Sequence, residues 1–173
     1  NGSVLYDPEQ AVYRMWYSVW NSHNYYNKLP FSYNICYAES KDGIQWQKPA
    51  LGVFTHESDP RNNCIRLGTD KTQAIDVCLN PQPDRYPGRF LAIHNQKGGV
   101  FVSSSEDGST FTFLHQAPAI GYHSDTHNNF VYDEVRDRWM LFCRPRAYAG
   151  DHKRRVSMQS SSDLQTWTHE RTL

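Results

Sequence analysis

Several features that mark other classes of protein are missing from this sequence of 173 residues. It has no apolar run near the roughly 18 residues that a membrane-spanning helix requires. No stretch of about ten or more residues shows clean helical periodicity. Lysine plus arginine number 18 and aspartate plus glutamate also number 18, so no net charge attracts a nucleic acid or an anionic membrane. We therefore expect a protein with little helix and with neither of these partners.

The four cysteines also lack a metal-binding pattern. Cys36, Cys64, Cys78 and Cys143 follow no spacing typical of a zinc site, and three of them fall inside predicted strands. Free cysteine behaves in proteins as a small hydrophobic residue. We therefore expect buried free thiols, no bound metal and no cofactor, and the cysteines point to no particular cellular compartment.

A short motif occurs three times, and each copy closes a segment rich in predicted strands. The motif Ser-x-Asp-[Gly/Leu]-x-x-[Trp/Phe] spans residues 40–46, 105–111 and 161–167. Its serine and aspartate suit a turn, because both side chains accept backbone N–H groups, and its terminal aromatic is expected to pack between sheets. Self-similarity at a period of about 40–65 residues indicates an array of repeated structural units.

Each repeat opens with two strand-like runs separated by a turn. The three openings align without gaps, and Asp7, Asn80 and Asp133 fall at the same turn position. A third run precedes each motif and alternates as a half-buried strand does. The aromatic residue of the motif then lies on a fourth, outer strand. One repeat is therefore predicted to be a four-stranded antiparallel meander, the blade of a β-propeller, with repeats at about 1–55, 62–115 and 122–173.

The length of the chain sets the number of repeats. At about 58 residues per blade, the sequence holds about three blades, whereas closed propellers have roughly four to eight. The sequence also begins at Asn1 rather than at a methionine. We therefore expect an all-β chain that is part of a longer propeller.

A family resemblance supports this fold. The segment Tyr37–Pro49, with Ser40-Lys41-Asp42-Gly43 and Trp46, resembles the blade-closing segment of the five-bladed propeller glycoside hydrolases. These are the invertases, fructanases, arabinanases and xylosidases of families 32, 43, 62 and 68. The sialidase motif is a weaker match, because it has one more residue between its aspartate and its glycine. The resemblance implies a five-bladed propeller with about three blades in this chain.

The resemblance also implies a function. Members of these families hydrolyse an oligo- or polysaccharide through carboxylates at the propeller axis. One carboxyl group protonates the leaving oxygen and another acts on the opposite side of the sugar ring, while a third acid orients the sugar hydroxyls. We therefore expect a glycoside hydrolase with a carbohydrate substrate. A carbohydrate-binding propeller without catalysis and a sialidase-like propeller are the alternatives, because fold alone does not fix function.

Only one of the three family carboxylates matches a residue of this chain. The family nucleophile aligns just before Asn1, and the general acid is expected after Leu173. Counting five residues back from the strand that begins at Phe130 reaches Asp125, which takes the place of the middle carboxylate. The neighbours of Asp125 differ from the family motif, since Ser124 precedes it where the family has arginine. Asp76, at the start of the equivalent strand in the second repeat, is the alternative catalytic carboxylate.

Polar and aromatic residues near these carboxylates are the expected sugar contacts. In an extended chain His123, Asp125 and His127 point to one side, which suits a polar sugar pocket and also, as an alternative, a metal ion. The paired Arg144 and Arg146 offer planar donors to Asp125 or to an acidic sugar. The other residues assigned to substrate binding are Asn128, His94 and Trp20, the last in a predicted loop from Asn21 to Pro30 that also carries Tyr25 and Tyr26.

Overall fold

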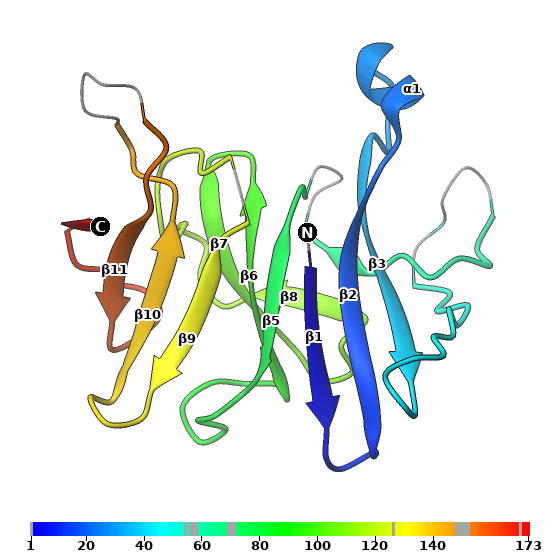
Figure 1. The fold of residues 1–173 in the computed structure, drawn as a ribbon, viewed down its shortest axis with the longest axis horizontal. Helices are drawn as coiled ribbons and strands as arrows, with labels where there is room; N and C mark the ends of the chain where they lie inside the picture. Colours follow the sequence, from blue (N-terminus) through cyan, green and yellow to red (C-terminus); the bar gives the residue numbers. More distant parts are fainter. Residues whose placement is uncertain are drawn as a thin grey trace.

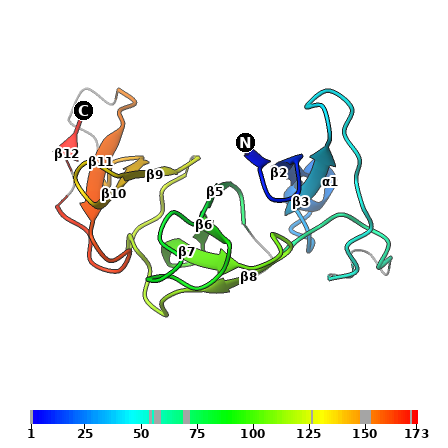
Figure 2. The ribbon, with the colours of Figure 1, turned by 90° about the horizontal axis from the view of Figure 1, so that it is seen from below.

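The computed structural model describes residues 2–53, 55, 59–68, 72–125, 127–147, 153–169 and 171–173, and it is almost entirely β-structure. Three separate sheets follow one another along the chain, and none of them closes on itself in these ranges. Figure 2 shows the sheets side by side around an open arc. The all-β prediction is therefore confirmed. The described part of the chain contains no helix long and apolar enough to cross a membrane.

The first sheet contains three antiparallel strands in the order β1-β2-β3. They are β1 (Gly2–Asp7), β2 (Val12–Trp20) and β3 (Tyr33–Ser40). A short helix, α1 (Ser22–Tyr26), lies between β2 and β3 where the sequence predicted only a loop. Asn21 starts this helix, because its side chain accepts the backbone N–H of Asn24 at 3.0 Å.

The second and third sheets repeat this meander. The second sheet has the order β4-β8-β7-β6-β5, and the third has the order β12-β11-β10-β9. The strands of the second sheet are β4 (Arg66–Leu67), β5 (Ile75–Leu79), β6 (Phe90–Gln96), β7 (Gly99–Ser105) and β8 (Thr110–Phe113). Those of the third are β9 (Asn129–Asp133), β10 (Arg138–Cys143), β11 (Ser157–Ser161) and β12 (Arg171–Thr172). The first strands β1, β5 and β9 line the inner side of the arc (Figures 1 and 2).

The repeated motif forms the predicted turn in all three copies. In the first copy Asp42 accepts the backbone N–H groups of Ile44 and Gln45, each at 2.8 Å, and Ser40 accepts that of Gly43 at 2.9 Å. These backbone bonds lower the pKa of Asp42. The equivalent bonds of Asp107 and Asp163 span 2.6–2.9 Å. The turn role of the motif is therefore confirmed.

The number of strands per repeat differs from the prediction in two sheets. The third sheet has the four strands expected, but the second gains a parallel fifth strand, β4, beside β8. In the first sheet the fourth strand shrinks to a bridge between Glu39 and Gln47. Pro49 follows two residues later and has no N–H with which to continue the ladder. The chain then pairs Cys64 with Cys36 and thereby covers the same edge of β3.

Two apolar cores lie between neighbouring sheets. Trp16 and Phe90 belong to the core shared by the first and second sheets, and Leu91 and Trp139 to the core shared by the second and third. Trp16 also donates its indole N–H to the carbonyl of Gly108 at 2.7 Å, which ties the first sheet to the second motif. Among the aromatic residues that end the motifs, Phe111 is buried. The other two, Trp46 and Trp167, are only half-buried and, contrary to the prediction, do not lie on a strand, because the first repeat has only a bridge there and β12 begins later, at Arg171.

Candidate functional site

Strands β1, β5 and β9 begin at the same end of the molecule, where β2 and β10 end (Figure 1). We call this end the rim. Asp125 lies on the rim just before β9, and its side chain is 55% exposed. Arg144, just after β10, donates to it at 2.9 Å, and the imidazole of His123 lies 3.7 Å away. The structure thus brings three of the predicted residues together around one accessible carboxylate.

A buried polar network fixes the loop that carries Asp125. The hydroxyl of Ser124 donates to Asn128 at 2.6 Å and accepts the backbone N–H of Arg144 at 3.1 Å. Asn128 and Asn95 of the second sheet bond to each other at 2.8 Å, and Asn95 also bonds the carbonyl of Ser124. Because Asn128 is 2% exposed, it positions the loop and has little surface for direct contact with a sugar.

Asp76 joins the three inner strands to one another. One oxygen of its carboxylate accepts the hydroxyl of Ser3 in β1 at 2.6 Å. The other oxygen accepts the backbone N–H of Phe130 at 3.1 Å and the side-chain amide of Asn129 at 3.3 Å, both in β9. Both oxygens are therefore engaged in holding β1, β5 and β9 together. This arrangement suits a structural carboxylate better than a proton donor.

A cavity of about 730 Å³ opens beside this part of the rim. Its lining residues are His127, Asn129, Phe142, Cys143, Arg144, Arg154, Arg155, Val156 and Leu173. The Nδ1 atom of His127 is buried and has no hydrogen-bond partner among the described residues. Burial lowers the pKa of His127, and the charge of Asp76 only partly opposes this. The imidazole is therefore neutral at neutral pH and able to accept or donate one hydrogen bond.

An aromatic cluster occupies the rim above the first sheet. Trp20, Tyr25 and Tyr26 are 46–74% exposed and pack edge-on, with ring centroids 5.4–6.2 Å apart. Tyr33 packs against Tyr25 at 5.8 Å. Burial raises the pKa of Tyr33, and the charge of Asp125 adds to this rise after that of Tyr25. The charge of Asp125 therefore acts on Tyr33, the residue that packs against the aromatic cluster.

Two other predicted contacts lie apart from this arrangement. His94 is 1% exposed, stacks on Phe113 and bonds the hydroxyl of Ser103 at 2.8 Å inside the second sheet. Burial lowers its pKa to about 3, so it remains neutral, and we leave it out of the proposed site. Arg146 is exposed beyond the end of β10, two residues after Arg144.

The metal alternative finds no support in the geometry. In the ranges that the structure describes, no three histidine, cysteine, aspartate or glutamate side chains gather closely enough to hold a metal ion. His123 and Asp125 do approach each other, at 3.7 Å. His127 instead lines the cavity, and Thr126 between them lies outside the described residues.

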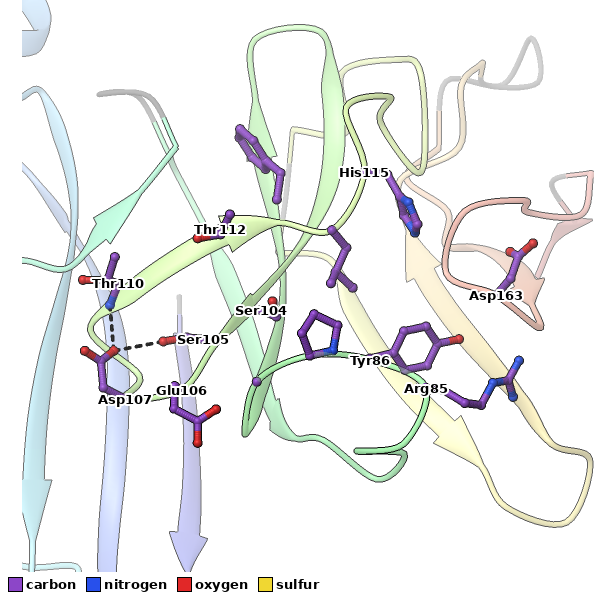
Figure 3. A pocket seen from close by; sticks show the side chains of 14 residues that line it. Arg85, Tyr86, Ser104, Ser105, Glu106, Asp107, Thr110, Thr112, His115 and Asp163 are labelled. Atoms are coloured by element: carbon purple, nitrogen blue, oxygen red, sulfur yellow. Dashed lines mark hydrogen bonds between the residues drawn. The ribbon is translucent and has the colours of Figure 1, made fainter.

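A second and larger cavity, of about 880 Å³, lies between the second and third sheets and shares no lining residue with the first. Figure 3 shows Tyr86, His115 and Asp163 around it. Of its three carboxylates, Glu106, Asp107 and Asp163, the last two already serve their own turns; for Asp107 the bonds from Ser105 and Thr110 are drawn. We therefore place the functional site at the rim.

Four residues at the rim were not predicted from the sequence. Asn129 bonds to Asp76 and lines the cavity, and Arg154 and Arg155 line the cavity from the segment before β11. The run Lys153-Arg154-Arg155, across the hairpin from Arg144, was the available signal for the two arginines. Tyr33 gave no comparable signal, because its contact with Tyr25 depends on the unpredicted helix α1.

Comparison with known proteins shows a likeness of fold and does not identify a family. No protein-family model matches it. The uncharacterized protein MT1551 of Mycobacterium tuberculosis is 26% identical in an alignment 141 positions long, which covers 76% of this chain and 42% of that protein. The crystal structure of an N-acetylgalactosamine deacetylase from F. plautii, in complex with blood group B trisaccharide, superposes with a TM-score of 0.54 and 14% identity. The superposition covers 99% of this chain and 49% of the deacetylase. This chain therefore spans less than half the length of either protein, and its likeness to the deacetylase is one of fold.

Proposed function

We propose that this chain is part of a carbohydrate-active β-propeller whose sugar site is the rim around Asp125. The observation that carries the proposal is the accessible Asp125 carboxylate, held by Arg144 and flanked by His123, on a rim that also carries half-exposed aromatic rings. Carboxylates accept hydrogen bonds from sugar hydroxyls, and aromatic faces pack on sugar rings. The solved structure of similar fold belongs to a protein that acts on a carbohydrate, which agrees with this assignment.

The exposed faces of the end sheets support the propeller architecture. Val4 and Phe130 occupy equivalent register positions, opposite Met15 and Leu141 respectively. Val4 is 57% exposed, whereas Phe130 is 5% exposed because the second sheet covers it. On the opposite face of the third sheet the side chains are exposed instead of buried, since Val131 is 52% exposed. Each end sheet thus exposes the face that a further blade on that side would bury.

Hydrolysis of a glycosidic bond is the reaction that we assign to the whole protein. Such a reaction requires two carboxyl groups on opposite sides of the bond. Asp125, exposed and paired with Arg144, suits the third acid, which orients the sugar. The proposal therefore places the nucleophile and the general acid on other blades of the propeller.

Carbohydrate binding without hydrolysis is the second candidate. The observation that favours it is the engagement of both Asp76 oxygens by Ser3 and by β9. That engagement leaves Asp125 as the exposed carboxylate of the described rim residues. A binding protein would need no further acid.

A saccharide panel tests the proposal and separates the two candidates. The full-length protein is incubated with neutral and acidic oligosaccharides, and binding, reducing-sugar release and acetate release are measured. Binding with new reducing ends supports a glycoside hydrolase, and binding without them supports the second candidate. Acetate release without new reducing ends would contradict hydrolysis and would indicate a deacetylase. Failure to bind any saccharide would overturn the proposal.

A further inference from the structure

The hairpin between β10 and β11 concentrates positive charge in a chain whose formal net charge is zero. Within residues 144–155 the sequence holds five of the 18 lysines and arginines but a single acidic residue, Asp151. The five cationic residues are Arg144, Arg146, Lys153, Arg154 and Arg155. The basic surface is therefore local, confined to one hairpin at the rim.

Three of these arginines and one histidine line the 730 Å³ cavity beside the rim. Arg144 directly follows β10, Arg154 and Arg155 lie shortly before β11, and His127 lies in the segment before β9. A volume of a few hundred Å³ or more is typical of small-molecule sites. The three arginines thus line a space large enough for a sugar residue. Asn129 and Phe142, which also line it, lie on the same face of the third sheet as the exposed Val131, so in the proposed propeller this cavity lies between the third sheet and the following blade.

The chemistry of these side chains selects for an anion. A guanidinium presents its N–H donors in a planar fork that matches the oxygens of a carboxylate, a sulfate or a phosphate. Arg144 also bonds Asp125 at 2.9 Å, so it connects the cavity to the carboxylate of the proposed sugar site. His127, whose buried Nδ1 has no partner among the described residues, lines the same cavity.

We propose that this cavity receives the anionic group of an acidic saccharide, a uronic acid carboxylate or a sulfate or phosphate ester, while the neighbouring ring contacts Asp125. This inference rests on the proposed carbohydrate function. A nucleic acid is the other common polyanion, but its binding usually requires a basic stripe over a larger surface, and the chain as a whole carries no net charge.

A glycan array of neutral, carboxylated, sulfated and phosphorylated oligosaccharides, with a short DNA duplex as a further arm, tests the inference. We expect acidic glycans among the ligands, and Arg154→Gln to weaken their binding by about tenfold while Arg154→Lys, which keeps the charge, weakens it less. Arg61→Gln removes an exposed arginine that pairs with Asp59 and does not line the cavity, and it serves as the control. The three anionic arms identify which group the cavity prefers.

Each outcome of this experiment decides between the claims. Binding of neutral glycans alone, or acidic binding unchanged in Arg154→Gln, overturns the acidic-saccharide inference and leaves the proposed function standing. Absence of any glycan ligand overturns both. Binding of the DNA duplex in preference to every glycan overturns the inference in favour of a nucleic-acid partner.

A separate observation concerns Cys36 and Cys64, whose sulfur atoms lie 3.6 Å apart. Cys36 is in β3, and Cys64 is in the connection between the first and second sheets. The flanking backbone bonds run from Tyr37 N–H to Asn63 O at 2.8 Å and from Ile65 N–H to Ile35 O at 3.0 Å. This pattern makes the cysteines a non-hydrogen-bonded antiparallel pair, with Cα atoms about 4.5 Å apart. That spacing lies within the range of disulfides.

We infer that Cys36 and Cys64 form a disulfide when the protein meets a low-molecular-weight disulfide oxidant. The thiolate of one cysteine attacks the oxidant, forms a mixed disulfide and releases one small thiol. The second cysteine then attacks the protein sulfur of that mixed disulfide, which forms the Cys36–Cys64 bond and releases the second small thiol. The two protein thiols together lose two protons and two electrons, and the oxidant is reduced to two thiols. The hydrogen bond from Cys36 lowers the pKa of Cys64, which favours Cys64 as the attacking thiolate. The bond ties the connection between two sheets to the outer edge of β3.

Oxidised glutathione, alkylation and peptide mass spectrometry test this pairing. We expect a Cys36–Cys64 peptide to appear, the Tm to rise, and dithiothreitol to reverse both changes. The disulfide should survive in Cys78→Ser and Cys143→Ser, which remove cysteines outside the pair, and should be absent in Cys36→Ser. Full alkylation of all four thiols after oxidation, or pairing that involves Cys78 or Cys143, would overturn the inference.

Discussion

Replacing Asp7 by alanine is expected to lower the free energy of unfolding by about 3–5 kcal/mol, the cost of breaking a buried ion pair from one side. The Asp7 side chain is 0% exposed and accepts Arg14 at 2.7 Å and Arg89 at 3.0 Å. Arg14 belongs to the first sheet and Arg89 to the second, and both guanidinium groups lie over the ring of Phe90 at 5.3 Å. Without Asp7 these two cations remain between the sheets with no shared counterion.

The equivalent residue of the third repeat provides a matched control. Asp133 also caps its turn, by accepting the backbone N–H groups of Val135 and Arg136 at 3.1 Å. Its partner Arg136 is 68% exposed, so Asp133→Ala leaves no buried charge behind and is expected to change stability much less. Urea titration of both variants at pH 7 measures the difference. A loss below about 1 kcal/mol for Asp7→Ala would refute the reasoning.

The same carboxylate gives the stability a pH dependence. Burial alone would raise the pKa of Asp7, but hydrogen bonds from Arg89 and Arg14 outweigh it and hold the pKa below its usual value. The unfolded chain therefore binds this proton at higher pH than the folded chain does. The contribution of Asp7 is fully present above the unfolded pKa, about 4, and is lost as the pH falls through the lower folded value. The acid branch of the stability profile should flatten in Asp7→Ala.

Three further predictions concern the motifs and the buried histidine. Gly43 and Gly108 have φ values of +74° and +78°, so alanine at either position should lower the free energy of unfolding by about 1–2 kcal/mol. The loss should be larger at Gly108, where a Cβ would lie 2.9 Å from Trp16. Equal losses of the two variants in a denaturant titration would contradict this. Leu164→Gly should destabilise by about 1–2 kcal/mol, because losing a side chain that is 1% exposed outweighs the strain relieved at φ 59°; a gain in Tm would disprove it. Burial lowers the pKa of His94 to about 3, so the unfolded state takes up the proton first and stability should fall as the pH drops below about 6.5. His94→Gln should reduce the slope of unfolding free energy against pH in this range. An unchanged slope would show that other groups cause it.

Local patterns in the sequence predicted local structure well. The Ser-x-Asp turns form as expected because every bond in them joins residues at most three positions apart. The hairpins that begin with Asp7 and Asp133 also share one register, with partners five residues later. The prediction of a fourth strand in the first repeat was wrong, because Pro49 ends the hydrogen-bond ladder and a distant segment around Cys64 pairs with β3 instead.

Features that depend on residues far apart in the sequence could not be predicted from it. The pairing of Asp7 with Arg89 and of Cys36 with Cys64 follows from how the sheets and their connections pack, and no periodicity encodes it. Asp76 was a catalytic candidate because it begins an inner strand, yet only the structure shows Ser3 and Phe130 bonded to it. The position of Asp125 on the rim was predicted from its offset to Phe130, and its role in function stays a prediction.

The kinetics of Asp125→Asn in the full-length protein test the central claim most directly. The substitution removes a charge at nearly constant volume, so the loop network of Ser124 and Asn128 is expected to keep the fold and the Tm intact. On a saccharide that the wild type hydrolyses, kcat/KM is expected to fall by at least about a hundredfold, equivalent to roughly 2.7 kcal/mol, while the exposed control Asp84→Asn leaves it unchanged. Unchanged kcat/KM together with an unchanged Tm would contradict the account and remove Asp125 from the site.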